Sequence, residues 1–159
     1  MGGALAAIVA AAAPRLPALV LLAPYVGMPR TLKAAALLHR AWGPFAGQFK
    51  AQSDLSIQDP DERAKNLAYG VTSAGAIRQL LEVTRVARKS LPSITAPTLI
   101  LQSRNDNRVS REVAEYAYRA IPAAEKQLAF VERGGHVLTV DHDREIVAAR
   151  ARDWFTTHM

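Results

Sequence analysis

Three short, mostly apolar runs stand out along the chain, each next to proline, glycine or charged residues. They are ALVLLA at 18–23, APTLILQ at 96–102 and KQLAFV at 126–131. Short apolar runs of this kind are typical of strands that are buried on both faces, as in a parallel sheet. The pattern therefore predicts three parallel strands.

Helical patterns separate these runs. The clearest covers residues 74–90, where apolar side chains recur along one face. Further helices are predicted at 2–13, 111–120 and 144–157, with Ser110 and Asp143 as the expected caps of the last two. The alternation of strands and helices predicts an α/β fold, a parallel sheet of about three strands flanked by helices.

Residues 27–72 differ from the rest because we find no strand pattern in them. Prolines and glycines, among them Pro44, interrupt short helical pieces at Leu32–Trp42 and Asp61–Ala68. We predict one domain over residues 1–159, with a helical insert at about 27–72.

Composition narrows the choice of function. The chain has no cysteine, which excludes disulfides, thiolate metal sites and a cysteine nucleophile. Its net charge is +6, but the basic residues lie at helical spacing without interleaved aromatics, so we expect no nucleic-acid partner. The apolar stretch at 16–26 contains two prolines and is too short to span a bilayer. We expect no membrane insertion, a cytoplasmic location, and neither cofactor nor metal, since no motif for either appears.

Polar loops follow the second and third predicted strands. Asp106 lies in SRNDNRV at 103–109, and His136 lies in RGGHV at 133–137. Neighbouring parallel strands bring such loops together at one edge of the sheet. An Asp that accepts the Nδ1 proton of a His leaves Nε2 free as a base. These are two members of a Ser–His–Asp triad, in the chain order Ser, Asp, His.

Each residue also has a plainer interpretation. Asp106 lies between two asparagines and could bond its own backbone in a turn. His136 follows two glycines and could be a surface histidine. Their joint occurrence, each after a buried strand and in this order, favours a catalytic pair.

Three stretches resemble a known family. Residues 97–109 resemble the "PTLI…G..D..V" stretch of the α/β-hydrolase fold, and GGHVLTVD at 134–141 is similar to "SGHV.T.D" of bacterial carboxylesterases and monoacylglycerol-lipase-like hydrolases. MGGALA at 1–6 resembles the residues directly after the nucleophile in their "G-x-S-M-G-G-A-L-A" elbow. The resemblance covers nearly the whole chain and corresponds to the carboxyl-terminal half or more of the family's domain. We therefore expect a partial α/β-hydrolase fold.

This resemblance implies a carboxylic ester hydrolase of the serine type, acting on a small-molecule ester through an acyl-enzyme. His136 would be the general base and Asp106 would orient it. The family's nucleophile would directly precede Met1, whose backbone N–H would serve the oxyanion hole. No serine of the chain has the elbow's glycines around it, so we expect the chain alone to be inactive.

The insert fits the position of the family's cap. Its large apolar residues could line an acyl pocket or could only hold the cap on the body, and the sequence leaves both possibilities open. These residues are Leu32, Leu37, Leu38, Trp42, Phe45 and Phe49.

Two other functions stay open. One is a hydrolase of another class on the same fold, such as an epoxide hydrolase or haloalkane dehalogenase with an Asp nucleophile. The other is a non-enzymatic module that binds a partner or an amphipathic ligand. The strand at 18–23 would also expose a free edge, through which we expect self-association.

Overall fold

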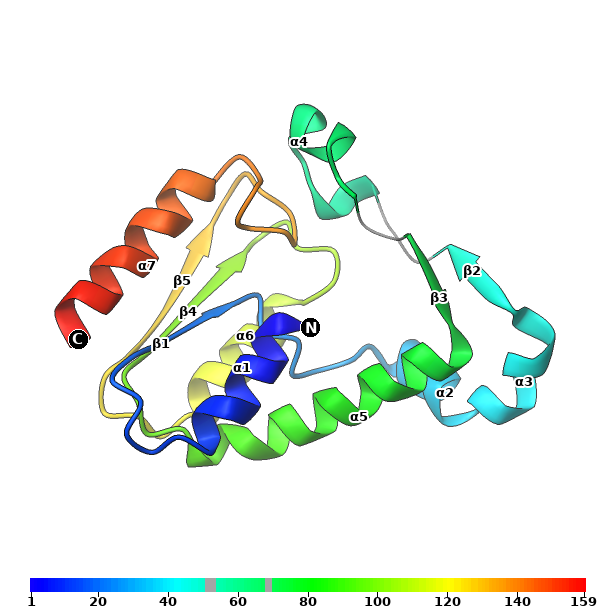
Figure 1. Cartoon of the computed structure of the whole chain (residues 1–159), viewed down its shortest axis with the longest axis horizontal. Coiled ribbons are helices and arrows are strands. Elements are labelled where there is room, and N and C mark those ends of the chain that lie inside the picture. The colour runs from blue at the N-terminus through cyan, green and yellow to red at the C-terminus, as the bar shows by residue number, and fades with distance from the viewer. Residues whose placement is uncertain (51–53, 68–69) are drawn as a thin grey trace.

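The body of the protein is built around a parallel sheet in the order β1–β4–β5, which lies between helices (Figure 1). β1 comprises Leu19–Leu22, β4 comprises Thr98–Ser103 and β5 comprises Lys126–Val131. This computed structural model describes residues 1–50, 54–67 and 70–159. All six residues of the middle strand β4 are buried, as expected for a strand covered on both faces. The predicted α/β fold with three parallel strands is thereby confirmed.

Helices cover both faces of the sheet. α1 (Gly2–Ala11) and α6 (Arg111–Ala120) lie on one face, and α7 (Arg144–His158) lies on the other (Figure 1). Successive residues of β4 face opposite sides of the sheet: Ile100 packs with α1 and α6, whereas Leu101 packs with α7. Among the described strands, β1 pairs with β4 alone. Self-association through its other edge stays a prediction.

The predicted caps of two helices behave differently from what we expected. Ser110 and Asp143 occupy the N-cap positions of α6 and α7, but neither side chain makes a capping hydrogen bond. The Asp143 carboxylate instead accepts hydrogen bonds from the backbone N–H groups of Arg133 and Gly134. This carboxylate therefore serves the loop before it rather than the helix after it.

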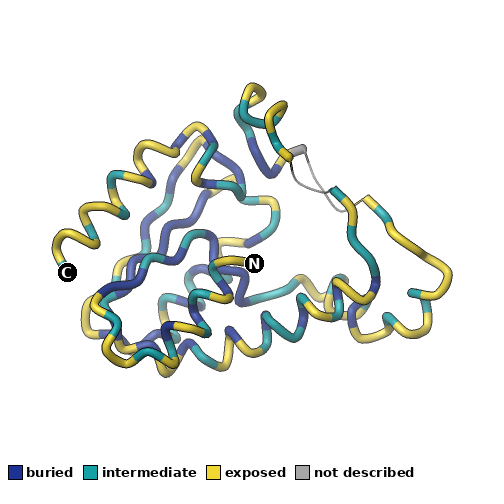
Figure 2. The backbone as a smooth tube through the Cα atoms, viewed as in Figure 1, coloured by how far each residue is buried: buried dark blue, intermediate teal, exposed yellow. Residues whose placement is uncertain are grey.

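The described residues between 27 and 73 form a lobe that projects beyond the sheet and is mostly exposed (Figure 2). We call it the cap. Its elements are α2 (Arg30–Leu37), α3 (His39–Ala46), β2 (Gln48–Lys50), the short 3₁₀ helix η1 (Asp54–Ser56), α4 (Pro60–Ala64) and β3 (Val71–Ser73).

Several expectations for the cap were wrong. β2 and β3 pair antiparallel, with Phe49 opposite Thr72, where no strand was expected. A strand of three residues is too short to display an alternating pattern in the sequence. The Phe49 ring packs against Trp42, with ring centroids 5.7 Å apart. The expected helix Leu32–Trp42 is two helices, and Pro44 lies inside α3 near its end. One lost backbone hydrogen bond is tolerable in so short a helix.

α4 begins at Pro60 and ends at Ala64, so it is shorter than the predicted Asp61–Ala68, and Ala68 lies outside the described residues. The Asp59 side chain caps it by accepting from the backbone N–H groups of Asp61 and Glu62. Proline suits the first helical position because its missing N–H has no partner there in any case.

The long helix α5 (Ala74–Ser90) joins the cap to the body, as predicted from its pattern (Figure 1). Ile77 and Leu81 in its first half pack against α2, and Ala87 in its second half packs in the core with α1. The 3₁₀ helix η2 (Leu91–Ser93) leads from it to β4. Within the described residues, no helix combines the length and the apolar character needed to cross a membrane.

Candidate active site

Asp106 and His136 meet at the carboxyl edge of the sheet, as their positions after β4 and β5 predicted. His136 Nδ1 lies 2.9 Å from Asp106 Oδ2. The Asp106 side chain is fully buried, whereas that of His136 is partly exposed. An ionised carboxylate can only accept, so the neutral form of the imidazole carries its proton on Nδ1 and its lone pair on Nε2. The imidazole is thus held in the tautomer that suits a general base.

Asp106 also bonds its own backbone in a turn, as its plainer interpretation predicted, because its two oxygens have different partners. Oδ1 accepts from the backbone N–H groups of Arg108, at 2.7 Å, and Val109, at 2.9 Å. Oδ2 accepts from His136 and from Gln102 Nε2, the latter at 2.9 Å. The carboxylate therefore fixes its own turn and the histidine together.

The charge state of Asp106 follows from these contacts. Burial by itself raises its pKa, but the hydrogen bond and charge of His136 and the two backbone N–H groups outweigh that effect. The net result is that the pKa of Asp106 lies below its usual range, so the carboxylate is ionised at neutral pH.

Sequence reasoning missed Gln102. Its side chain is fully buried, and Nε2 also donates to the backbone carbonyl of Val109 at 3.0 Å. A polar side chain in a strand predicted to be buried on both faces was an available signal, because such a group needs partners.

Two further carboxylates hold the loop of His136. Asp143 Oδ2 accepts from the backbone N–H groups of Arg133, at 2.7 Å, and Gly134, at 2.9 Å. Asp141 Oδ2 accepts from Gly135 N–H at 2.6 Å. Asp141 lies within the stretch that carries the family resemblance, but nothing in its spacing revealed this role.

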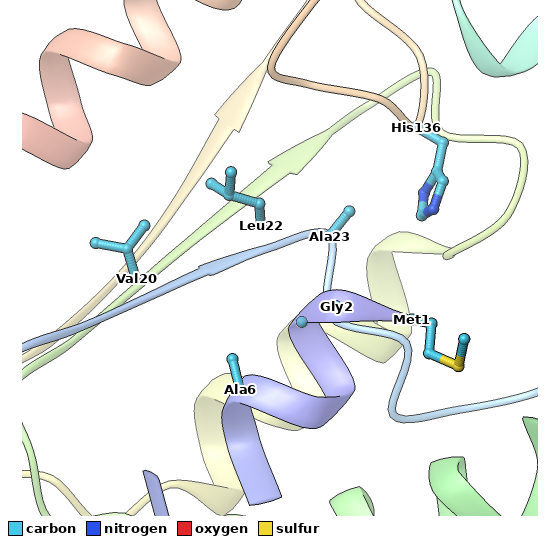
Figure 3. Close-up of a pocket in the computed structure, with 8 residues that line it drawn as sticks. Met1, Gly2, Ala6, Val20, Leu22, Ala23 and His136 are labelled. Atoms are coloured by element: carbon cyan, nitrogen blue, oxygen red, sulfur yellow. The ribbon is translucent and has the colours of Figure 1, made fainter. Parts of the chain in front are cut away.

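His136 borders a cavity of about 360 Å³ beside the start of α1 and the end of β1. Figure 3 shows His136 above Met1, with Gly2, Ala6 and the β1 residues around them. Ala23, directly after β1, has a φ of 42°, a strained value for a residue with a side chain. Met1, whose backbone N–H is the predicted oxyanion donor, lines the same cavity as His136, the predicted general base.

A larger cavity of about 630 Å³ also reaches His136 and Met1. Leu32 of the cap lines it, together with apolar residues of α5 such as Leu80 and Val83. Tyr25 also lines it, and burial raises the pKa of its phenol, which is therefore neutral. Of the other apolar cap residues, Leu38, Trp42 and Phe49 line a second hollow of about 520 Å³, which Leu32 also borders. Leu37, Leu38 and Phe45 are exposed.

Known proteins share this architecture. The solved structure of a metagenome-derived lipolytic enzyme matches with a TM-score of 0.86 and 33% identity, over 99% of this chain and 62% of that one. The carboxylesterase of Bacillus subtilis (strain 168) is 25% identical over 119 residues, 75% of this chain and 48% of its own length. The thermostable monoacylglycerol lipase of Bacillus sp. (strain H-257) is 28% identical over 102 residues, which are 64% of this chain and 40% of its own length.

The chain spans about half the length of the curated relatives that it matches. Its similarity to the lipolytic enzyme extends over nearly all of its own residues and includes the sheet, the helices and the cap. The fold is that of the α/β-hydrolases, as the resemblance implied. Since the family described as serine aminopeptidase S33 matches residues 1–143, the chain belongs to that family of hydrolases.

Proposed function

We propose that this chain is part of a carboxylic ester hydrolase of the serine type. The observation that carries the proposal is the hydrogen bond between the buried Asp106 side chain and His136, which lines a largely apolar cavity. The pair supplies a base next to a space that accepts an apolar group. The carboxylesterase and lipase relatives support the same reaction class.

The cavity favours an ester over a peptide with a free amino terminus. A site for a substrate ammonium needs a carboxylate or another anion close by. Among the described residues that line the larger cavity there is no Asp or Glu, and Arg108 adds a positive charge. We therefore assign an uncharged ester with an apolar acyl group as the substrate class.

The proton steps follow from the tautomer of His136. Nε2 takes the proton of the attacking serine hydroxyl and then gives it to the leaving alcohol, which leaves an acyl-enzyme. Water enters, Nε2 takes one of its protons, and the serine leaves with that proton as the acid forms. Asp106 stabilises the imidazolium in both halves without becoming protonated.

The start of α1 supports an oxyanion site. The first N–H groups of a helix have no partner within it, and the helix dipole places positive potential there. Met1 is the N-cap of α1 and lines both cavities that reach His136. We assign its backbone N–H, within a longer chain, as a donor to the oxygen that becomes negative.

We place the nucleophilic serine immediately before Met1. No serine is found among the described residues that line the two cavities at His136. The resemblance of residues 1–6 to the segment after the nucleophile supports this position. The 159-residue chain alone is then inactive, since loss of the nucleophile costs about 10⁶ in kcat in a well-studied serine protease.

The test compares the full-length product of the gene with the 159-residue chain, using p-nitrophenyl esters and a fluorophosphonate label. We expect turnover and a labelled serine directly before Met1 in the full-length protein, and neither in the chain. His136→Ala lowers kcat about 10⁶-fold. His39→Ala, a histidine that bonds the carbonyl of Ala36 outside both cavities, keeps the activity.

Other results overturn the proposal in distinct ways. A label within residues 1–159, or equal turnover by the chain alone, refutes the position of the nucleophile. Hydrolysis of amino-acid amides without hydrolysis of esters favours an aminopeptidase. A folded full-length protein that neither turns over nor takes the label leaves the binding module as the function.

A further inference from the structure

A short segment of the cap, Ser56–Asp59, lies against both loops of the candidate site. The Ser56 carbonyl accepts from Val137 N–H at 3.1 Å, next to His136. Ser56 Oγ donates to Asn107 Oδ1 at 3.1 Å and accepts from Arg108 Nε at 3.2 Å, next to Asp106. We call Ser56–Asp59 the brace.

Asp141 joins the brace to the loop of His136. Its carboxylate is fully buried and accepts four backbone N–H groups. Two come from the brace, Gln58 at 2.8 Å and Asp59 at 2.9 Å. The other two are Gly135 at 2.6 Å and His142 at 2.9 Å. One buried charge thus ties the cap to the residue directly before His136.

The backbones of the cap and the loop also touch directly. A Cβ atom at Gly135 would lie 2.7 Å from the Ser56 carbonyl oxygen and 2.9 Å from that of Leu55. Only glycine fits so close to two backbone oxygens. A movement of the brace must therefore move Gly135 or break these contacts.

We infer that Asp141 is a positioning residue that makes the orientation of His136 depend on the docked brace. This inference rests on the proposed function for its kinetic consequence. With the brace in place, Asp141 fixes the Gly135 backbone, and the imidazole is directed at Asp106. With the brace released, Asp141 loses two of its four donors and the loop loses its contacts with the cap, while Asp143 still holds Arg133 and Gly134.

Asp59 offers a matched pair of variants that leaves the loop untouched. Its φ of −63° is the value that a proline ring imposes, so Asp59→Pro removes the N–H donor without forcing a new φ. Asp59→Ala keeps that N–H and removes the side chain, which caps α4 and lies 3.7 Å from His142 and 3.6 Å from Arg144. The two variants thus share the loss of the carboxylate and differ in the hydrogen bond to Asp141.

The experiment measures kcat and KM for an ester and the downfield NMR resonance of the His136 Nδ1 proton in the full-length protein. Asp141→Asn and Asp59→Pro are expected to lower kcat by up to about 10²-fold, as for a misplacement of about 1 Å, with a smaller change in KM. Both also broaden or shift the resonance. Asp59→Ala retains the resonance and most of kcat.

Equal kcat and an equal resonance in Asp59→Pro and Asp59→Ala overturn the inference. If the variants fail to fold, hydrogen exchange in the unmodified protein decides instead. The Asp59 and Gly135 amides should open with one common free energy, and clearly different values refute the coupling. Absence of ester turnover in the unmodified protein defeats the proposed function alone, because the resonance and the exchange rates still test the inference.

Discussion

The two loops that carry Asp106 and His136 differ in how they are held. In the first, the Asp106 carboxylate accepts two N–H groups of its own turn and one from Gln102 of the preceding strand, and Ser56 of the cap adds contacts to Asn107 and Arg108. The second is held from outside, by Asp141 and Asp143 further along the chain and by the cap. The aspartate thus depends mainly on residues close to it in the sequence, whereas the histidine depends mainly on residues further along the chain and in the cap.

Replacing Asp106 gives the largest expected effect. Asp106→Asn keeps an oxygen for the turn but removes the charge that fixes the His136 tautomer. We expect kcat of the full-length enzyme to fall about 10⁴-fold, as in the Ser–His–Asp template. Steady-state kinetics with an ester checks this.

Asp106→Ala separates the two roles of that carboxylate. It removes the turn acceptor as well, so we expect its free energy of unfolding to be about 1–3 kcal/mol lower than that of Asp106→Asn. Urea unfolding measures the difference. Equal stabilities would mean that the loop does not depend on its aspartate.

A methyl group at Gly135 tests the outside support of the second loop. The two backbone oxygens within 2.9 Å of the new Cβ cannot move away independently of the cap. Gly135→Ala should therefore cost about 1–3 kcal/mol in unfolding free energy and reduce kcat. Gly134→Ala is the control, because its Cβ would meet the Asp141 Cβ at 3.2 Å, a milder contact. Equal losses in the two variants would contradict a tight approach of cap and loop.

Lowering the pH should reduce the free energy of unfolding, because it protonates the buried carboxylates of Asp106 and Asp141 that hold the two loops. Burial raises the pKa values of Asp106 and Asp141, but their hydrogen-bond donors outweigh it and hold both pKa values below the ordinary one. A depressed native pKa gives stability that is complete above the unfolded value, about 3.9, and is lost as the pH falls through the native value. Asp106→Asn and Asp141→Asn should each flatten the fall in unfolding free energy below about pH 4. An unchanged slope in either variant would show that its carboxylate is not perturbed.

The exposed ion pair between the two loops should matter least. Arg104 Nε lies 2.7 Å from Glu132 Oε1, with both side chains substantially exposed. Glu132→Gln should change the unfolding free energy by less than about 1 kcal/mol, and the difference should shrink in high salt. A loss as large as that of Gly135→Ala would show that this surface contact also supports the loops.

The sheet, the long helices and the meeting of Asp106 with His136 were predictable because each rests on a pattern within a few residues. Apolar runs marked the strands, and parallel topology brings neighbouring loops to one edge. The cap strands were missed because three residues show no periodicity. Pro44 was expected to interrupt a helix but lies inside α3, because a helix of eight residues can lose one hydrogen bond near its end.

The support of His136 was not predictable, for a different reason. Asp141 bonds Gln58 and Asp59 across more than eighty residues of chain, and no local pattern records such a contact. Asp143 was assigned to the helix after it because its position is that of a cap, yet its carboxylate turns back to the loop. Sequence spacing places a residue on an element but does not choose between partners on its two sides.

A double-mutant cycle on Asp106→Asn and His136→Ala tests the central claim most directly. If Asp106 acts on the reaction through His136, then kcat/KM for an ester should be no lower in the double variant than in His136→Ala alone. A double variant that loses the product of the two single effects would contradict the account, because the two residues would then contribute independently.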